Sequence, residues 1–168
     1  MIDSWKSAMR QQFHAAIDML ANAIEACPDS LWSGQGLSAF WYLAFHVLFF
    51  LDLYLSEVDE PRFLPPPPFG LTELEQEVVP PQRVYRKDEL LVYVEHCRNR
   101  LDTVMTGMTN SWAANPCPIP YRDMSNGELL LYNMRHVQHH AAQLNLLLRQ
   151  ASVIPPDWVS KGGKNRNA

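Results

Sequence analysis

The chain has 168 residues, 47% of them apolar, and a formal net charge of −4. This length suggests one domain with a sizeable core, and the mild negative charge argues against broad nucleic-acid binding. The three cysteines, Cys27, Cys97 and Cys117, are widely spaced and include no CxxC pair. That spacing excludes a zinc knuckle and a thioredoxin-type motif and favours reduced thiols in a cytoplasmic protein.

The first half of the chain contains two expected helices. Residues 2–26 have apolar side chains at three- and four-residue spacing, which predicts an amphipathic helix that ends before Pro28. A second helix is expected from about Ser38, as N-cap, to Ser56. It is apolar on most sides, so we expect it to be the most buried. Its apolar run, residues 37–51, is too short to span a bilayer.

The second half contains two further helices. The third is expected to begin after Asp88 and to end between Gly107 and Asn110. The fourth opens with the pattern of a capping box, Ser125 to Glu128, and runs to about Gln150. Strand signals are weak throughout, because no run of alternating β-branched residues reaches ordinary strand length.

A long connection joins the second and third expected helices. Its roughly thirty residues include Pro65–Pro68, which favour a stiff extended spacer. Thr72 to Glu75 has the pattern of another capping box and predicts a short helix. The connection can cross the full length of a bundle, which predicts an all-α four-helix bundle with a long crossover between helices 2 and 3. We expect one domain over residues 1–160 and a flexible tail over residues 161–168.

Three histidines fall on helix faces that we expect to point inward. His136 and His140 are four residues apart and share one face of the fourth helix, whereas His139 lies on a flanking face. His46 lies on an apolar stripe of the second helix with Leu43. Taken alone, each histidine could simply be a hydrogen-bonded core residue. Burying three imidazoles together requires partners, and one divalent metal would satisfy all of them.

The sequence therefore predicts a mononuclear metal site of His46, His136 and His140, with one position open for water or substrate. Neutral imidazole suits Zn²⁺, Ni²⁺, Cu²⁺ or Fe²⁺. The absence of HExxH and of Glu-x-x-His excludes the metalloprotease and ferritin-like patterns. Asn133 and Gln143 lie three residues from the paired histidines and are candidates to hydrogen-bond the ligating imidazoles.

Other polar residues are assigned less direct roles. Asp52 lies six residues beyond His46 and is interpreted as a surface residue. His14 and His96 are interpreted as structural or solvated. No catalytic residue is assigned.

Four stretches carry a resemblance to a known family: residues 30–46, residues 83–91, residues 135–144 and residues 155–159. Together they resemble the DinB/YfiT-like proteins, a superfamily of four-helix-bundle metalloenzymes. The resemblance implies that His46, His136 and His140 bind Zn²⁺ or Ni²⁺, that the chain forms a homodimer, and that it takes part in transfer reactions with low-molecular-weight thiols. Ala141 and Ala142 stand where relatives often carry a bulkier, charged pair.

We therefore expect a cytoplasmic, divalent-metal-dependent enzyme that transfers a low-molecular-weight thiol to an electrophilic small molecule, as a thiol S-transferase or a hydrolase-like enzyme. The alternative is a non-catalytic metal-stabilised bundle that acts as a stress-related or interaction protein. The expected partners are a small-molecule substrate and a second copy of the chain, without nucleic acid or membrane. Trp112, Tyr121 and Trp158 would suit a dimer surface if they are exposed.

Overall fold

The computed structural model describes residues 2–34, 36, 38–75, 81 and 83–162. Its long helices are α1 (Ile2–Ala26), α3 (Phe40–Leu55), α4 (Lys87–Gly107) and α6 (Asn126–Gln150). The connections hold the short helices α2 (Asp29–Trp32) and α5 (Asn110–Ala114) and the 3₁₀ turns η1 (Glu60–Arg62) and η2 (Thr72–Leu74). The described residues form no strand beyond one isolated bridge, so the predicted all-α class is confirmed.

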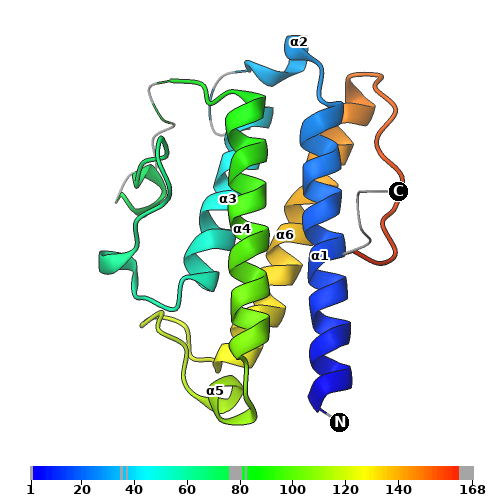
Figure 1. The fold of residues 1–168 in the computed structure, drawn as a ribbon. Helices are drawn as coiled ribbons and strands as arrows, with labels where there is room; N and C mark the ends of the chain where they lie inside the picture. Colours follow the sequence, from blue (N-terminus) through cyan, green and yellow to red (C-terminus); the bar gives the residue numbers. More distant parts are fainter. Residues whose placement is uncertain (1, 35, 37, 76–80, 82, 163–168) are drawn as a thin grey trace.

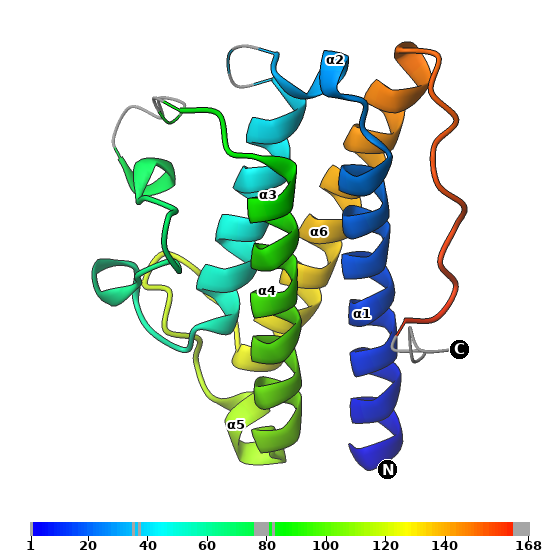
Figure 2. The same ribbon diagram turned by 45° about the horizontal axis from the view of Figure 1, so that its top comes forward.

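The four long helices lie side by side (Figure 1). α6 packs against α1 and α3, and α4 packs against the same two helices. α1 and α6 run in one direction, and α3 and α4 run in the opposite direction (Figures 1 and 2). Residues 56–75, 81 and 83–86 are the described part of the segment that connects α3 to its parallel neighbour α4. We call this segment the crossover.

α3 is buried along nearly its whole length, as its apolar composition predicts. Only Leu43, His46 and Phe50 are partly exposed. The sequence predicts that this stripe points inward where it meets the fourth helix. It does meet α6, since the rings of His46 and Phe50 lie 5.5 Å and 5.9 Å from that of His136, but these side chains are only partly buried. The stripe lies on the face of α3 that borders the molecular surface, because the other faces of the helix are more apolar and pack into the core. His46 therefore stays accessible.

The crossover is anchored by two phenylalanines. The Phe63 ring lies 5.3 Å from that of Phe49, and the Phe69 ring lies 4.4 Å from that of Tyr93. The Phe69 amide donates to the Pro66 carbonyl at 3.1 Å, which forms a turn. The prediction that the prolines form an extended spacer is therefore wrong at their C-terminal end, because this turn directs Phe69 into the core.

The helix caps agree with the sequence only in part. The Ser125 hydroxyl accepts from the Glu128 amide at 3.3 Å and the Glu128 carboxylate accepts from the Ser125 amide at 2.8 Å, which confirms the capping box of α6. Ser38 was predicted as the N-cap of α3, but Ala39 holds that position without a side-chain bond. The predicted capping box at Thr72 is also wrong, because the Thr72 hydroxyl has no partner among the described residues and η2 is a single 3₁₀ turn.

The C-terminal segment returns along α1. The Gly162 amide donates to the Gln11 carbonyl at 3.1 Å, and the Gln12 side chain donates to the Ser160 carbonyl at 3.1 Å. Of the predicted tail, residues 163–168 lie outside the described residues. None of the helices in the described part of the chain has the length and hydropathy needed to cross a membrane.

Candidate metal centre

The structure brings His46, His136 and His140 together where α3 meets α6. One ring nitrogen from each histidine lies within 4.8 Å of the others. The His136 and His140 rings are 4.5 Å apart, and the His46 ring lies 5.5 Å and 5.0 Å from them. The one-turn spacing on α6 places two of the imidazoles on one face, and the packing of α3 against that face supplies the third.

Hydrogen bonds at Nδ1 orient two of the imidazoles. Nδ1 of His46 lies 2.6 Å from Oε2 of Glu73, and Nδ1 of His140 lies 2.6 Å from Oε1 of Gln143. Both partners are acceptor oxygens, so each Nδ1 carries a proton, and in the neutral form of each imidazole Nε2 keeps its lone pair. Gln143 thus lies where the sequence placed it. The Asn133 amide instead donates to the Leu51 carbonyl at 3.1 Å and so joins α6 to α3.

Glu73 is the site residue that the sequence did not reveal. It lies on η2, and its side chain is only 2% exposed. The Tyr42 hydroxyl donates to its second oxygen. Burial, together with the neighbouring Glu73 carboxylate, raises the pKa of Tyr42, so the phenol stays a donor. No local sequence pattern predicts this contact, because Glu73 and His46 lie in different elements and meet only through the tertiary fold.

Burial and crowding keep the paired histidines neutral. Burial, reinforced by the other imidazoles, lowers the pKa of His136 to about 3 and that of His140 to about 4. A metal-ligating imidazole must be unprotonated, which both side chains are at pH 7.

The donor set fits a divalent metal. Nδ1 of His136 is buried without a hydrogen-bond partner among the described residues. Buried polar atoms are normally hydrogen-bonded or bound to a metal, so this nitrogen is consistent with a ligand site. Imidazole nitrogens suit Zn²⁺ and Ni²⁺, and the partners on His46 and His140 are those that ligating histidines commonly have.

Asp52 is fully buried, so its prediction as a surface residue is wrong. Its carboxylate accepts from the Tyr93 hydroxyl and from Nε2 of His96, each at 3.1 Å, and pairs with Arg100 at 3.1 Å. All three partners come from α4, so this cluster joins α3 to α4 on a face away from the triad. Because α3 is buried on most sides, the Asp52 carboxylate does not reach solvent, and its hydrogen-bonding partners come from a neighbouring helix.

His14 has a structural role, as the sequence predicted. It is 7% exposed and binds Asp102 at 2.8 Å.

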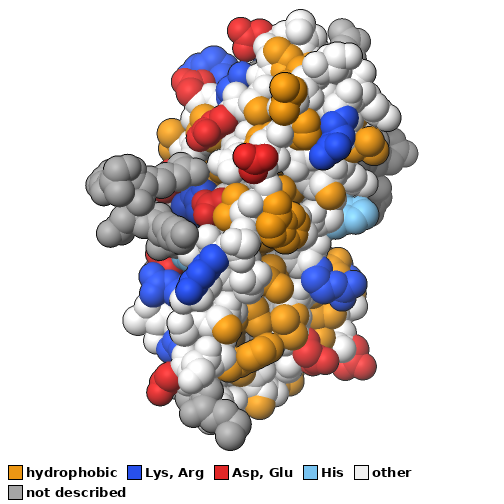
Figure 3. Space-filling view, turned by 90° about the vertical axis from the view of Figure 1, so that its right-hand side faces the viewer, with side chains coloured by type: hydrophobic (Ala, Val, Ile, Leu, Met, Phe, Trp, Pro, Cys, Tyr) orange, Lys and Arg blue, Asp and Glu red, His pale blue; other side chains and the backbone are white. Residues whose placement is uncertain are grey.

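One sizeable cavity lies away from the triad. A cavity of about 710 Å³, with Trp5, Met9 and Leu130 in its wall, lies near the start of α1 and α6. Figure 3 shows hydrophobic side chains gathered on this side of the molecule. A smaller cavity of about 590 Å³ opens beside His136, with Ala142 and Trp158 in its wall. Of these two cavities, the smaller one has a triad histidine in its wall, so ligand chemistry and not cavity size locates the candidate site.

Comparison with protein families identifies the family of the chain. No curated protein matches the chain. The family model described as the DinB family matches residues 1–159, which include all four long helices and the three histidines. The chain therefore belongs to the DinB family.

Proposed function

We propose that the chain is a divalent-metal-dependent enzyme whose His46, His136 and His140 hold Zn²⁺ or Ni²⁺. The observation that carries this proposal is the convergence of three imidazoles, two of them oriented by Nδ1 bonds that leave Nε2 free. Within the described ranges, no fourth His, Cys, Asp or Glu joins the cluster. Three protein ligands with an open position are typical of catalytic metal sites, whereas structural sites are closed.

The chain's own residues prepare the site for this role. Glu73 and Gln143 fix the rings of His46 and His140, and burial keeps His136 and His140 unprotonated. The cavity beside His136 has room for a small molecule, and His136 is the triad member in its wall. When bound, the metal would lower the pKa of a thiol or water in the open position and so supply a nucleophile at neutral pH.

We propose a low-molecular-weight thiol as that nucleophile, transferred to an electrophilic small molecule. The resemblance to thiol-transferring DinB/YfiT-like proteins supports this by analogy. The chain's own thiols are poorly suited to the task. Cys27 and Cys97 are buried, and burial raises the pKa of Cys27 to about 11 and that of Cys97 well above its ordinary value. Cys117 is half-buried beside the Arg122 carbonyl. The reacting sulfur would therefore come from the substrate.

The test is metal-dependent thiol transfer. Cysteine and 1-chloro-2,4-dinitrobenzene serve as probes: the thiolate sulfur forms a bond to the ring carbon and chloride leaves. We expect zinc- or nickel-loaded wild-type protein to accelerate the reaction, and metal-free protein and His140→Ala to show only the background rate. Tight metal binding without acceleration for cysteine or other small thiols would contradict thiol transfer. It would favour the non-catalytic metal-stabilised bundle, acting as a stress-related or interaction protein.

We further propose that the helices form a DinB/YfiT-like four-helix bundle with a crossover, and that the chain is a cytoplasmic homodimer. The packing of α1, α3, α4 and α6 supports the bundle. Tyr121 and Trp158 are 58% and 68% exposed and could contribute to a dimer surface. Trp112 is half-buried, and its indole donates to Glu57, so it is less available. Light scattering should give twice the mass of one chain, and the mass of a single chain would contradict the dimer.

A further inference from the structure

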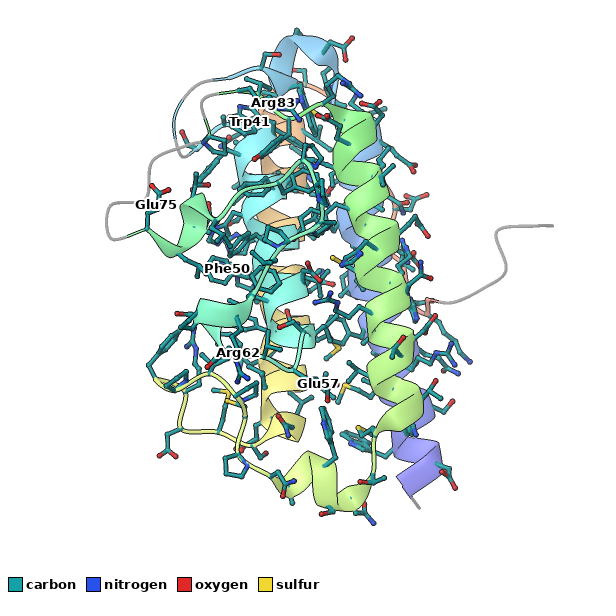
Figure 4. All side chains as sticks on the ribbon, turned by 60° about the vertical axis from the view of Figure 1, so that its left-hand side comes forward. Trp41, Phe50, Glu57, Arg62, Glu75 and Arg83 are labelled. Carbon is teal, nitrogen blue, oxygen red and sulfur yellow. The ribbon has the colours of Figure 1, made fainter. Side chains whose placement is uncertain are left out.

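The turn η2 is held in place differently from the part of the crossover that precedes it. Phe63 and Phe69 anchor that preceding part through aromatic packing. Beyond Phe69, η2 buries a carboxylate instead, that of Glu73. Figure 4 shows the crossover lying over α3, with Glu75 on the outer side of η2. The two acidic residues of this turn therefore have opposite environments.

Docking of η2 depends on two side chains of α3. Burying a carboxylate is unfavourable unless its oxygens have partners. Oε2 of Glu73 accepts from Nδ1 of His46 at 2.6 Å, and Oε1 accepts from the Tyr42 hydroxyl. Tyr42 and His46 are four residues apart and share one face of α3. One of the two groups that hold η2 in place is thus a member of the triad.

We propose that Glu73 is a positioning residue that couples docking of the crossover to metal binding by the triad. The inference rests on the metal site proposed above. A carboxylate on one ring nitrogen fixes the imidazole and increases the basicity of the other nitrogen, which strengthens its bond to a metal. A metal on Nε2 in turn makes the Nδ1 proton a stronger donor to Glu73.

The coupling is reciprocal. If the docked carboxylate raises metal affinity by some factor, metal must raise the docking equilibrium of η2 by the same factor. The backbone from Phe63 to Leu74 should therefore be more protected in the metal-bound protein than in the metal-free protein. The protection of this segment would therefore depend on whether metal is bound, although the segment supplies no metal ligand.

The first test is zinc affinity, measured by competition with a chromogenic chelator. Glu73→Ala should bind zinc about 10- to 100-fold more weakly than wild type, because it loses the partner of His46. Glu73→Gln keeps an acceptor oxygen but not the charge and should fall in between. Glu75→Ala is the matched control on the same turn and should bind like wild type. Unchanged zinc affinity in both Glu73 variants would overturn the coupling but not the metal site. Absence of zinc binding by wild type would overturn both.

The second test is hydrogen–deuterium exchange of the segment from Phe63 to Leu74, with and without saturating zinc. Zinc should slow exchange there in wild type and in Glu75→Ala, and should lose this effect in Glu73→Ala. A purely structural role for Glu73 would speed exchange equally in both states and leave the zinc effect intact, which would overturn the proposal. Glu73→Gln preserves the side-chain volume and serves for both tests if the alanine variant does not fold.

Discussion

At the scale of single residues, burial decides the chemistry of the triad. His136 and His140 have pKa values lowered to about 3 and about 4, first by burial and then by the neighbouring imidazoles. In the unfolded chain both histidines would take up a proton near pH 6.5. The unfolded state therefore binds more protons than the folded state between pH 6.5 and about 4, so the stability of metal-free protein must fall as pH is lowered through that range.

This pH dependence gives the first prediction. The free energy of unfolding of metal-free wild type, measured with urea at pH 7.5 and pH 4.5, should fall more than that of His136→Gln, whose amide does not titrate. Acidic residues elsewhere contribute equally to both proteins and cancel in the comparison. Equal losses in the two proteins would contradict a neutral, buried His136.

The buried Asp52 gives the second prediction. Asp52→Ala leaves Arg100 without its counter-ion and the buried Tyr93 hydroxyl without an acceptor, which should cost about 3 kcal/mol in urea unfolding. Asp59→Ala removes an exposed pair with Arg62 and should change stability far less. Zinc affinity should be unchanged in both variants, because all partners of Asp52 lie on α4. Weakened zinc binding in Asp52→Ala would show that the two clusters are linked.

At the scale of elements, the sequence predicted α6 far better than α3. The α6 pattern contains both a capping box and a clear apolar stripe, so its start and the shared face of His136 and His140 could both be predicted. α3 is apolar on nearly every side, so its pattern does not show which face is central. This is why the partial exposure of Leu43 and His46 could not be predicted and why the sequence suggests a surface position for Asp52, which is buried.

The contact of Glu73 with His46 could not be predicted from local patterns. It depends on the turn at Pro66 to Phe69 and on the packing of Phe63, both of which are tertiary features of the crossover. The pattern from Thr72 to Glu75 indicates a capping box. In the structure, packing against α3 instead places Glu73 in contact with His46. Non-local contacts of this kind leave no periodic signal in the sequence.

The capping box of α6 gives the third prediction. Ser125→Ala removes the acceptor for the Glu128 amide and should lower the free energy of unfolding by about 1 kcal/mol. Ser4 is exposed on α1, so Ser4→Ala serves as the control and should change stability little. Urea unfolding measures both variants. A loss no greater than that of the control would mean that the α6 N-terminus is held by tertiary contacts alone.

At the scale of the whole molecule, the candidate site joins separate parts of the fold. α3 supplies His46, α6 supplies His136 and His140, and the crossover supplies Glu73. A metal bound there would link α3 to α6, and a ligand that binds only the folded state raises stability by mass action.

The fourth prediction follows from that linkage. Zinc at about 100 times its dissociation constant should stabilise the protein by about 2.7 kcal/mol, and a chelator should remove the effect. Thermal unfolding should show the shift in wild type and in His139→Ala, whose exposed histidine is outside the triad, but not in His136→Ala. An equal shift in His136→Ala would mean that zinc binds elsewhere.

The central claim is that three histidines hold one metal and leave a position open. X-ray diffraction from zinc-loaded crystals, recorded on both sides of the zinc absorption edge, tests it most directly. We predict one anomalous peak per chain, bonded by His46, His136 and His140, with a fourth ligand that does not come from the protein. Absence of a peak at the triad, or a fourth protein side chain closing the site, would contradict the account.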